Sequence, residues 1–426
     1  MPARNNGGTI VQLFRLGLAW GAAASAMTIS LAAANAAPTV LNFWDMNWGD
    51  TAYVDAAKAL VDEFNKSHAD VQVSYRSVPW SNWYETYVTA IASGSAPDIS
   101  TGAGFQAVQF YGFGEILPVD DVVDAIGADA FSKGTLEAVK WDGHYVALPW
   151  MVDIRAIFYR KDLLAAAGIN PPTTWDEFRA AAKKLSNGST YGVVASGDSG
   201  GSHWVPTFMI SNGAGMFDKE RNAAVTSERS MEALDFIGSL VADGSVNPSS
   251  AGYSSDDARG SFQRNEAAFI LSGPNLPELV GATGAQTAVL PPLKGPHGDL
   301  GTVNWVNNIM IYKQSKHPTE AKDFLRWWSD NQLALWTKGN ANGIPARAEY
   351  QKDPYFQGRE HVADIIKNYL PVAQPMSATA GGTFPAMNEV DGDGFLRTLI
   401  QKIWQGQSVA DAAREAQAHL EELLKK

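Results

Sequence analysis

The sequence predicts an α/β fold in which strands and helices alternate around a largely parallel sheet. Extended apolar segments alternate with segments whose apolar residues recur at helical spacing, which is the pattern of successive β-α-β units. The chain has 426 residues, 45% of them hydrophobic, which is enough for two domains with sizeable cores. In order along the chain, the first such segments are 39–44, 52–64, 71–75, 84–92 and 98–100.

Ligands of such sheets bind beyond the carboxyl ends of the strands. In this chain those ends fall at residues 45–48, 77–80 and 101–106, which are rich in aromatic and polar side chains. We therefore expect a binding site to be assembled there. The glycine- and serine-rich segment 196–202 is interpreted as a loop near the same site.

A second run of elements begins near residue 146. Two strands are expected, followed by a short helix that Gly168 terminates. Thr174 then caps a helix, and Glu177 stands three residues on, as in a capping box. The two strands are predicted at 146–150 and 156–159, and the later helices at 178–185, 230–242, 256–265, 319–328, 359–369 and 409–425.

The amino terminus has the composition of a secretory signal peptide. Arg4 and Arg15 precede an apolar stretch over 16–34, and Ala36 completes a small-x-small cleavage pattern. A membrane anchor is the alternative, but the stretch is rich in Ala and Ser and no charge cluster follows it. The sequence predicts a signal peptide at 1–36, cleavage near Ala36 and a periplasmic location.

Composition narrows the class further. The chain has no Cys, so neither disulfides nor a lipid-modified cysteine is expected. It has 33 Lys and Arg against 45 Asp and Glu, a net charge of −12, and this acidity argues against nucleic acid as a partner. No later segment is apolar for long enough to predict a membrane span. No metal or other cofactor is expected, and the protein is expected to be a monomer.

Tryptophan usage points to a carbohydrate-like ligand. Several of the 14 Trp stand beside Gly, Asn, Asp or Pro rather than within apolar helical faces. Any single one is more typical of a core, but indole rings at strand ends suit the flat C–H faces of sugars, while amides and charged groups bind hydroxyls. The residues in such settings are Trp48, Trp80, Trp83, Trp150, Trp204 and Trp305.

One long stretch resembles a known family. Residues 145–177, which include Asp153 and Arg155, resemble a block of the bacterial extracellular solute-binding proteins that deliver carbohydrates to ABC importers. Shorter stretches are similar to further motifs of the family in the same order. These are 94–99, 273–274, 313–318 and 343–347.

The resemblance implies a two-lobed, maltose-binding-protein-like fold of type II, each lobe a mostly parallel sheet flanked by helices, with a ligand cleft between the lobes. It implies hinge closure on the ligand and docking on the transmembrane subunits of an ABC permease. By the same resemblance, one lobe comprises 37–154 plus 303–350, and the other 155–302 plus 351–426.

Residue chemistry and resemblance together predict the site. Asp153 is expected to accept hydroxyl hydrogen bonds, and Arg155 either to join it or to form a structural ion pair with it. Arg347 matches the family's guanidinium, which can donate paired bonds. Asn275 stands where relatives have a stacking Trp, a loss that Trp305 could offset. The full predicted set is Asn47, Trp48, Trp80, Gln106, Asp153, Arg155, Trp204, Asn275, Trp305, Asn307 and Arg347.

Three questions stay open at this level. The ligand can be a sugar, a disaccharide, a polyol or a sugar acid. A secreted glycoside hydrolase is the competing function, because it too would need aromatics and two carboxylates in a cleft. Residues 389–394 faintly resemble a calcium loop, but no terminal Glu closes it, and a solvated turn before a helix at Phe395 is expected instead.

Overall fold

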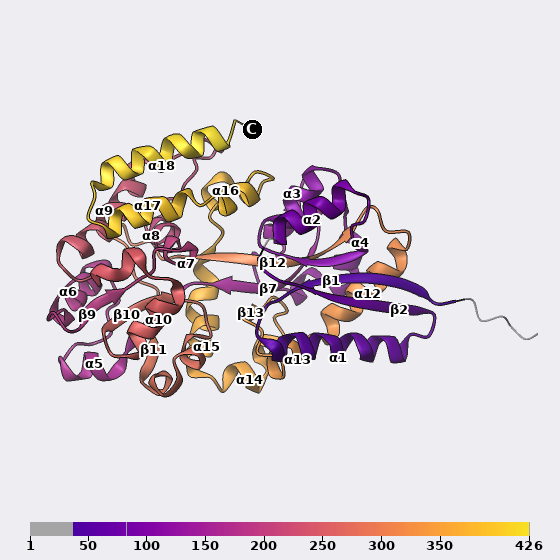
Figure 1. Ribbon diagram of the computed structural model, residues 1–426, viewed down its shortest axis with the longest axis horizontal. Coiled ribbons are helices and arrows are strands. Elements are labelled where there is room, and N and C mark those ends of the chain that lie inside the picture. The colour runs from indigo at the N-terminus through magenta and orange to yellow at the C-terminus, as the bar shows by residue number, and fades with distance from the viewer. Residues whose placement is uncertain (1–36, 82, 426) are drawn as a thin grey trace, which may run out of the picture. The chain divides into compact units, whose positions relative to one another are not determined.

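The computed structural model describes residues 37–81 and 83–425 (Figure 1). Residues Pro38–Lys426 form one compact unit of the chain. The signal peptide predicted at 1–36 lies outside the described residues. Among those that are described, no helix is long and apolar enough to span a membrane.

The first sheet contains the predicted amino-terminal strands. β1 pairs in parallel with both β2 and β3, as the alternating pattern predicted. The long strand β12 is antiparallel to β3 and to β7, so the sheet is mixed rather than mostly parallel. Across the sheet the order is β13 (Ile344–Pro345), β7 (Leu148–Ile154), β12 (Thr302–Tyr312), β3 (Ile99–Gly102), β1 (Thr39–Met46) and β2 (Val71–Val78).

Amphipathic helices pack against this sheet. In α1 (Thr51–Ser67), Asp50 caps the amino terminus by accepting from the backbone N–H of Ala52 at 2.8 Å. Tyr53, Leu60 and Phe64 lie on its buried face. Phe64 meets Phe324 of a later helix edge to face, with ring centroids 4.9 Å apart. The other helices of this region include α2 (Trp83–Ala92), α3 (Gln106–Gly112), α12 (Pro318–Asn331) and α13 (Ala334–Thr337).

The second sheet has four strands and its own helices. β8 is antiparallel to both of its neighbours, and only β10 and β9 are parallel, so this sheet is also mixed. The strand order is β11 (Thr287–Val289), β8 (Ala156–Arg160), β10 (Ala267–Ser272) and β9 (Tyr191–Val194). Its helices include α6 (Trp175–Leu185), α9 (Glu228–Ala242), α10 (Ser255–Gln263), α17 (Phe395–Trp404) and α18 (Val409–Leu423).

The predicted cap of α6 is present in part. The hydroxyl of Thr174 accepts from the N–H of Glu177 at 3.2 Å. The Glu177 carboxylate, however, accepts from the backbone and hydroxyl of Thr173 rather than from Thr174, so the box is shifted by one residue. Gly168, with φ of 61°, follows the short helix α5 (Lys161–Ala166) as expected.

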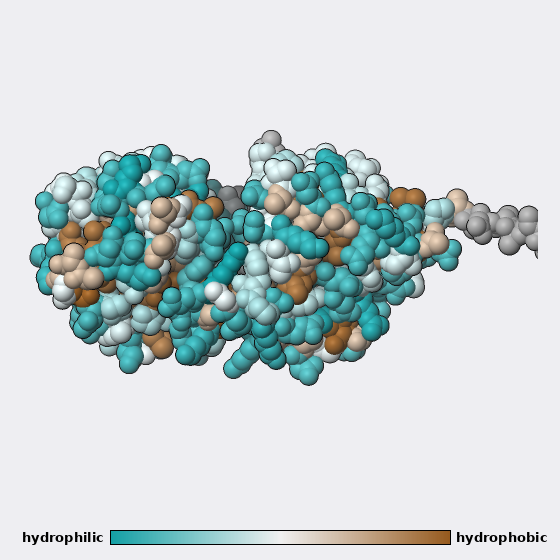
Figure 2. Space-filling model, turned by 90° about the horizontal axis from the view of Figure 1, so that it is seen from below, coloured by the Kyte–Doolittle hydropathy of each residue, from teal (hydrophilic) through white to brown (hydrophobic). Residues whose placement is uncertain are grey.

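Strands β7 and β12 link the two sheet regions. In β12, Val306 belongs to the first hydrophobic core, whereas Val303 and Trp305 pack into the second. β7 ends at Ile154, and β8 of the second sheet begins two residues later at Ala156. Figure 1 shows both strands running from one sheet region toward the other. Figure 2 shows that hydrophilic residues cover most of one face of the molecule, with hydrophobic residues in small separate patches. The two lobes are therefore joined through continuous strands.

Three local predictions are corrected. Residues 389–394 are not a turn, since α16 spans Met387–Asp393, where Met387 and Val390 are buried against the second core and Gly394 ends the helix with φ of 94°. The segment 196–202 is partly helical, as α7 (Ser199–Ser202). The helix predicted at 359–369 divides into α15 (Glu360–Asp364) and a π-helical turn at Ile365–Tyr369, just before Pro371.

Candidate functional site

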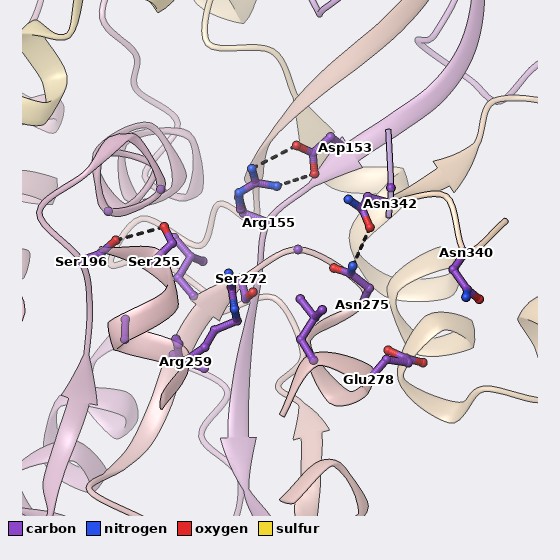
Figure 3. Close-up of a pocket in the computed structure, with 18 of the residues that line it drawn as sticks. Asp153, Arg155, Ser196, Ser255, Arg259, Ser272, Asn275, Glu278, Asn340 and Asn342 are labelled. Atoms are coloured by element: carbon purple, nitrogen blue, oxygen red, sulfur yellow. Dashed lines mark hydrogen bonds and ion pairs between the residues drawn. The ribbon is translucent and has the colours of Figure 1, made fainter. Parts of the chain in front are cut away.

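A cavity of about 660 Å³ lies where residues from both sheet regions meet. Its lining combines polar and apolar side chains, and Figure 3 shows side chains reaching it from strand ends, short helices and loops on different sides. Of the residues predicted from sequence, Asp153, Arg155, Trp204 and Asn275 line this cavity. The other polar or aromatic lining residues are Asp50, Ser196, Ser255, Arg259, Ser272, Glu278, Asn340, Asn342, Tyr355 and Arg359.

Asp153 and Arg155 form a bidentate ion pair at the end of β7. The Arg155 Nη2 donates to Asp153 Oδ2 at 3.0 Å, and Nη1 donates to Oδ1. The Asp153 side chain is still 32% exposed, so its remaining lone pairs can accept from a ligand. The two sequence interpretations of this pair are thus compatible, because an ion pair fixes a carboxylate that faces the cavity.

His203 holds the other edge of the Arg155 guanidinium. Arg155 Nε donates to His203 Nδ1 at 2.8 Å. Burial, together with the positive charge of Arg155, keeps the pKa of His203 well below its ordinary value. The neutral imidazole can therefore accept from Arg155. The sequence analysis did not single out His203, although it directly precedes Trp204.

Trp305 lies opposite Asp153 in the β7–β12 pair. Its ring centroid is 4.5 Å from that of His203 and 5.0 Å from the Arg155 guanidinium carbon, and the residue is only 8% exposed. Its indole N–H donates to Asp391 Oδ2 at 3.2 Å. The role of Trp305 as a stacking platform stays a prediction, and its surroundings favour packing between the strand and α8 (Trp204–Ser211).

Asp391 brings a second carboxylate to this cluster from α16. Loss of solvation by the surrounding protein raises the pKa of Asp391 to about 6, and the Trp305 N–H and the charge of Arg155 partly offset this effect. The sequence analysis missed Asp391 because the segment was interpreted as a solvated turn. The one available signal was a helical spacing of Met387 and Val390, which places two apolar side chains on the buried face.

Two asparagines meet across the cavity. Asn275, which follows β10, donates from Nδ2 to Asn342 Oδ1 at 2.7 Å, and Figure 3 shows the two side chains pointing toward each other. By the predicted boundaries they belong to different lobes. Below them, Arg359 lies 4.0 Å over the ring of Tyr355 and 3.6 Å from the Glu278 carboxylate. Each of these contacts ties one side of the cavity to the other or fixes a charged group on its wall.

The serine side of the cavity is organised by Asp198. This carboxylate caps α7 by accepting from the N–H of Gly200 at 2.9 Å, and it also accepts from Ser196 Oγ at 2.7 Å and from the N–H of Ser255 at 2.6 Å. The helix terminus is therefore already occupied by an anion. Arg259 stands beside these serines and pairs with Asp256.

The predicted residues near β1 do not line the cavity. Trp48 is 3% exposed, donates to Thr101 Oγ1 at 3.1 Å and packs edge to face on Trp80 and Trp150. Trp80 is 45% exposed and donates to the backbone oxygen of Asn47 at 2.6 Å. This group builds the wall from which Gly49 and Asp50 reach the cavity.

The remaining three predicted residues are buried and hold neighbouring protein groups. Asn307 Oδ1 accepts from the N–H of Gly104 at 3.1 Å, and Gln106 Oε1 accepts from that of Ala103 at 3.2 Å, so both fix the turn before α3. Arg347 donates to Asp330 at 2.7 Å and to Glu349 at 2.6 Å. Contact of these residues with a ligand remains a prediction.

Within 37–81 and 83–425, no cluster of three or more His, Asp or Glu is arranged to hold a metal.

The sequence is similar to one family of known proteins. The family described as bacterial extracellular solute-binding protein matches residues 47–334. An arabinooligosaccharide-binding protein of Bacillus subtilis is 27% identical over 312 residues, covering 67% of this chain and 68% of the relative.

Solved structures agree in fold. A sugar transporter from Arthrobacter chlorophenolicus A6 with bound laminaribiose is similar with a TM-score of 0.80 and 31% identity, over 91% of this chain and 100% of that chain. The maltose-bound MalE3 of T. maritima is similar with a TM-score of 0.75 and 24% identity, over 90% of this chain and 100% of that chain.

Proposed function

Since this chain belongs to the bacterial extracellular solute-binding protein family, we propose that it is the periplasmic substrate-binding protein of an ABC importer for a neutral sugar of two or more rings. The observation that carries the proposal is the cavity between the two sheet regions, whose wall holds the Asp153–Arg155 pair beside apolar and aromatic side chains. Sugar-bound relatives with the same fold support the ligand class.

The charges of the cavity argue for a neutral ligand. Asp153 is paired with Arg155, Glu278 with Arg359, and Arg259 with Asp256. A sugar acid would have to compete for a guanidinium that already has a carboxylate partner, whereas hydroxyl groups can use the lone pairs and N–H groups left over. The paired charges therefore favour neutral sugars and polyols over sugar acids.

The size of the cavity argues against a single small polyol. Its volume of about 660 Å³ lies in the middle of the range for small-molecule sites, and such sites bury most of the surface of their ligand. A ligand with one ring or fewer would leave polar walls on both sides without partners. A disaccharide or short oligosaccharide can contact Asp153, Asn275 and the Ser196–Ser255 side at once.

Capture would proceed by hinge closure around β7 and β12. The walls of the cavity come from both sheet regions, and β7 and β12 run from one region toward the other. A ligand that contacts both walls stabilises the closed population relative to the open one. The closed form would then deliver the sugar to the transmembrane subunits of a permease.

A thermal-shift screen of the mature chain, residues 37–426, tests the proposal. Laminaribiose, maltose, arabinobiose, ribitol and gluconate form a panel that spans the open classes. A ligand present at one hundred times Kd should stabilise the fold by about 2.7 kcal/mol, which is a shift of a few degrees. We expect a neutral disaccharide to give the largest shift. A shift with gluconate or ribitol alone would overturn the neutral-oligosaccharide assignment.

The glycoside hydrolase alternative rests on one specific observation. Asp153 is held by a guanidinium, whereas the pKa of Asp391, in the same cluster, is raised to about 6. Two carboxyl groups in unlike environments are what acid-base hydrolysis of a glycoside needs. Incubating the protein with the disaccharide that binds, and measuring released monosaccharide, separates the functions. Stoichiometric binding without product supports transport, and turnover that Asp391→Asn abolishes would establish hydrolysis.

A further inference from the structure

A second cavity of about 510 Å³ lies behind the strands that carry the first. Trp305 pairs directly with Asp153, so both side chains stand on the cleft face of the β7–β12 pair. The neighbouring residues of β12, Asn304 and Val306, therefore face the opposite side, and both line the second cavity. We call it the rear groove. Its charged and aromatic lining residues include Lys133, Glu137, Lys140, Trp141, Asp142 and Arg221.

Arg221 supplies an oriented cation to the rear groove. Its guanidinium carbon lies 5.1 Å from the ring centroid of Trp141 and 5.2 Å from that of Phe384, so two aromatic rings hold it. The backbone of Arg221 is left-handed, with φ of 68°, in a turn closed by Asp218. Within the described part of the chain, no carboxylate forms an ion pair with this guanidinium.

The other charges leave the groove with a positive excess. Lys140 pairs with Glu137 at 3.9 Å. Lys133, like Arg221, forms no ion pair with any described residue, and Asp142 is the remaining acid on the exposed rim. A ligand carboxylate can take two parallel N–H bonds from Arg221 while Lys133 adds a second positive charge.

Two buried polar atoms on the groove wall are without hydrogen-bond partners among the described residues. They are the Asn304 Oδ1 and the Thr383 Oγ1, on residues that are 7% and 5% exposed. An unsatisfied buried acceptor or hydroxyl destabilises the fold, so such groups usually have a hydrogen-bond partner in the functional state. Ligand hydroxyl groups can donate to both atoms after a small adjustment of the wall.

We propose that the rear groove is a second binding site, for a small carboxylate that also carries hydroxyl groups. Arg221 and Lys133 bind the carboxylate, Asn304 and Thr383 bind hydroxyls, and the edge of Trp141 provides an apolar contact. This ligand class differs from the neutral sugar of the cleft, because Arg221 and Lys133 form no ion pair with a described residue, whereas Arg155, Arg259 and Arg359 of the cleft are paired.

The position of the groove predicts how its ligand affects the cleft. The lining comes from 133–143 on one side and from Arg221 and 373–383 on the other, with β12 between them. If β7 and β12 bend so that the cleft narrows, the rear groove behind them widens. A ligand that bridges the rear groove therefore favours the open cleft and opposes sugar binding, and the coupling is reciprocal. This part of the inference depends on the proposed hinge closure.

Isothermal titration with gluconate at low ionic strength tests the site itself. Sorbitol, with hydroxyls only, and acetate, with a carboxylate only, are the matched probes, and both should bind at least tenfold more weakly than gluconate. Arg221→Gln removes the charge but keeps a long polar side chain at this left-handed position, and it should weaken gluconate binding at least tenfold. The control is Arg264→Gln, which removes an exposed arginine paired with Glu266 and should change nothing.

Asp153→Ala distinguishes the rear groove from the cleft. Gluconate binding should persist in this variant if the rear groove holds it, and its loss would place gluconate in the cleft and overturn the proposal. Equal affinity for gluconate and acetate, or unchanged binding in Arg221→Gln, would show an unspecific anion effect only and would also overturn it.

The coupling is tested by titrating the cleft sugar with and without saturating gluconate. We expect a sugar Kd at least about fivefold higher when the rear groove is occupied. An unchanged Kd would refute the coupling. If no sugar binds at all, the proposed function fails, whereas gluconate binding that depends on Arg221 would still establish the site.

Discussion

Arg155 and Arg347 both belong to the predicted site, yet their surroundings differ in what is left for a ligand. The side chain of Arg347 is 8% exposed, bonds to Asp330, Glu349 and Ser329, and lies between the rings of Phe131 and Tyr350. Arg155 bonds to one carboxylate and one imidazole, and the carboxylate faces the cavity.

The partners of a charged group, rather than its type, therefore decide whether it stabilises the fold or prepares a ligand site. A guanidinium that is buried among protein carboxylates and aromatic rings adds to stability and has little to offer a ligand. One that fixes a half-exposed carboxylate instead prepares an acceptor for ligand hydroxyls.

The largest expected effect is on stability, from Trp305→Ala. The ring contacts His203, Arg155 and Gly104, so its removal leaves a cavity between the strand and its neighbours. We expect the free energy of unfolding in urea to fall by about 3 kcal/mol, the low end for a large aromatic side chain, and sugar affinity to fall less than tenfold. Unchanged stability with a greater than tenfold loss of affinity would instead make Trp305 the stacking platform.

Arg347→Ala should destabilise the ligand-free protein by about 2–3 kcal/mol, because several charge-assisted bonds are lost while the acidic partners can turn to solvent. Sugar affinity of the folded fraction should stay within twofold of wild type. Arg155→Gln is the matched comparison, with the reverse pattern expected. If Arg347→Ala lowers affinity as much as Arg155→Gln does, the distinction between the two arginines is lost.

Asp153→Ala probes the cleft side of the comparison. Losing an ionised acceptor of ligand hydroxyls should raise the sugar Kd about tenfold to a hundredfold, which corresponds to roughly 1.5–3 kcal/mol. Calorimetric titration measures this directly, and urea unfolding of the ligand-free variant should remain close to wild type. Asp153→Asn should recover part of the affinity, since an amide oxygen still accepts. Wild-type affinity in the alanine variant would remove Asp153 from the site.

Asp45 gives an effect on stability that depends on pH. It is fully buried and accepts from Thr101 at 2.8 Å, Tyr53 at 2.9 Å and Tyr75 at 3.0 Å. Burial raises its pKa to about 7, an effect that the hydroxyl donors partly offset. The folded state therefore binds more protons than the unfolded state between about pH 4 and 7, so stability falls as pH rises through this window.

Asp45→Asn isolates this contribution. The difference in unfolding free energy between wild type and variant should change with pH between about 4 and 7 and level off above 7. A difference that is independent of pH over this window would contradict the raised pKa. Asp391, whose pKa is raised in the same direction, is present in both proteins and cancels from the comparison.

The elements that depend on local sequence patterns could be predicted from the sequence. The periodicity that gave a helix at 52–64 corresponds to α1, and the Thr174 cap starts α6, because both depend on residues within one or two turns. Asp153, Arg155, Trp204 and Asn275 were placed at the cavity by resemblance and residue chemistry together. The two-lobed fold with its cleft was predicted in the same way.

Contacts between distant segments could not be predicted in that way. The β7–β12 register, which sets Trp305 opposite Asp153, joins strands far apart in sequence. The partners of Arg347 and the contact between Trp305 and Asp391 depend on how whole elements pack. The antiparallel pairings of β12 and β8 likewise arise from chain topology, so the expectation of mostly parallel sheets was wrong.

Small-angle X-ray scattering can detect directly whether the cleft closes on a neutral sugar. The mature chain should be measured alone and with the saturating disaccharide identified by the thermal screen, with Asp153→Ala at the same sugar concentration as the control. We predict a smaller radius of gyration for the wild-type complex and no change for the variant where the sugar does not bind. Superimposable profiles for free and sugar-saturated wild-type protein would contradict closure.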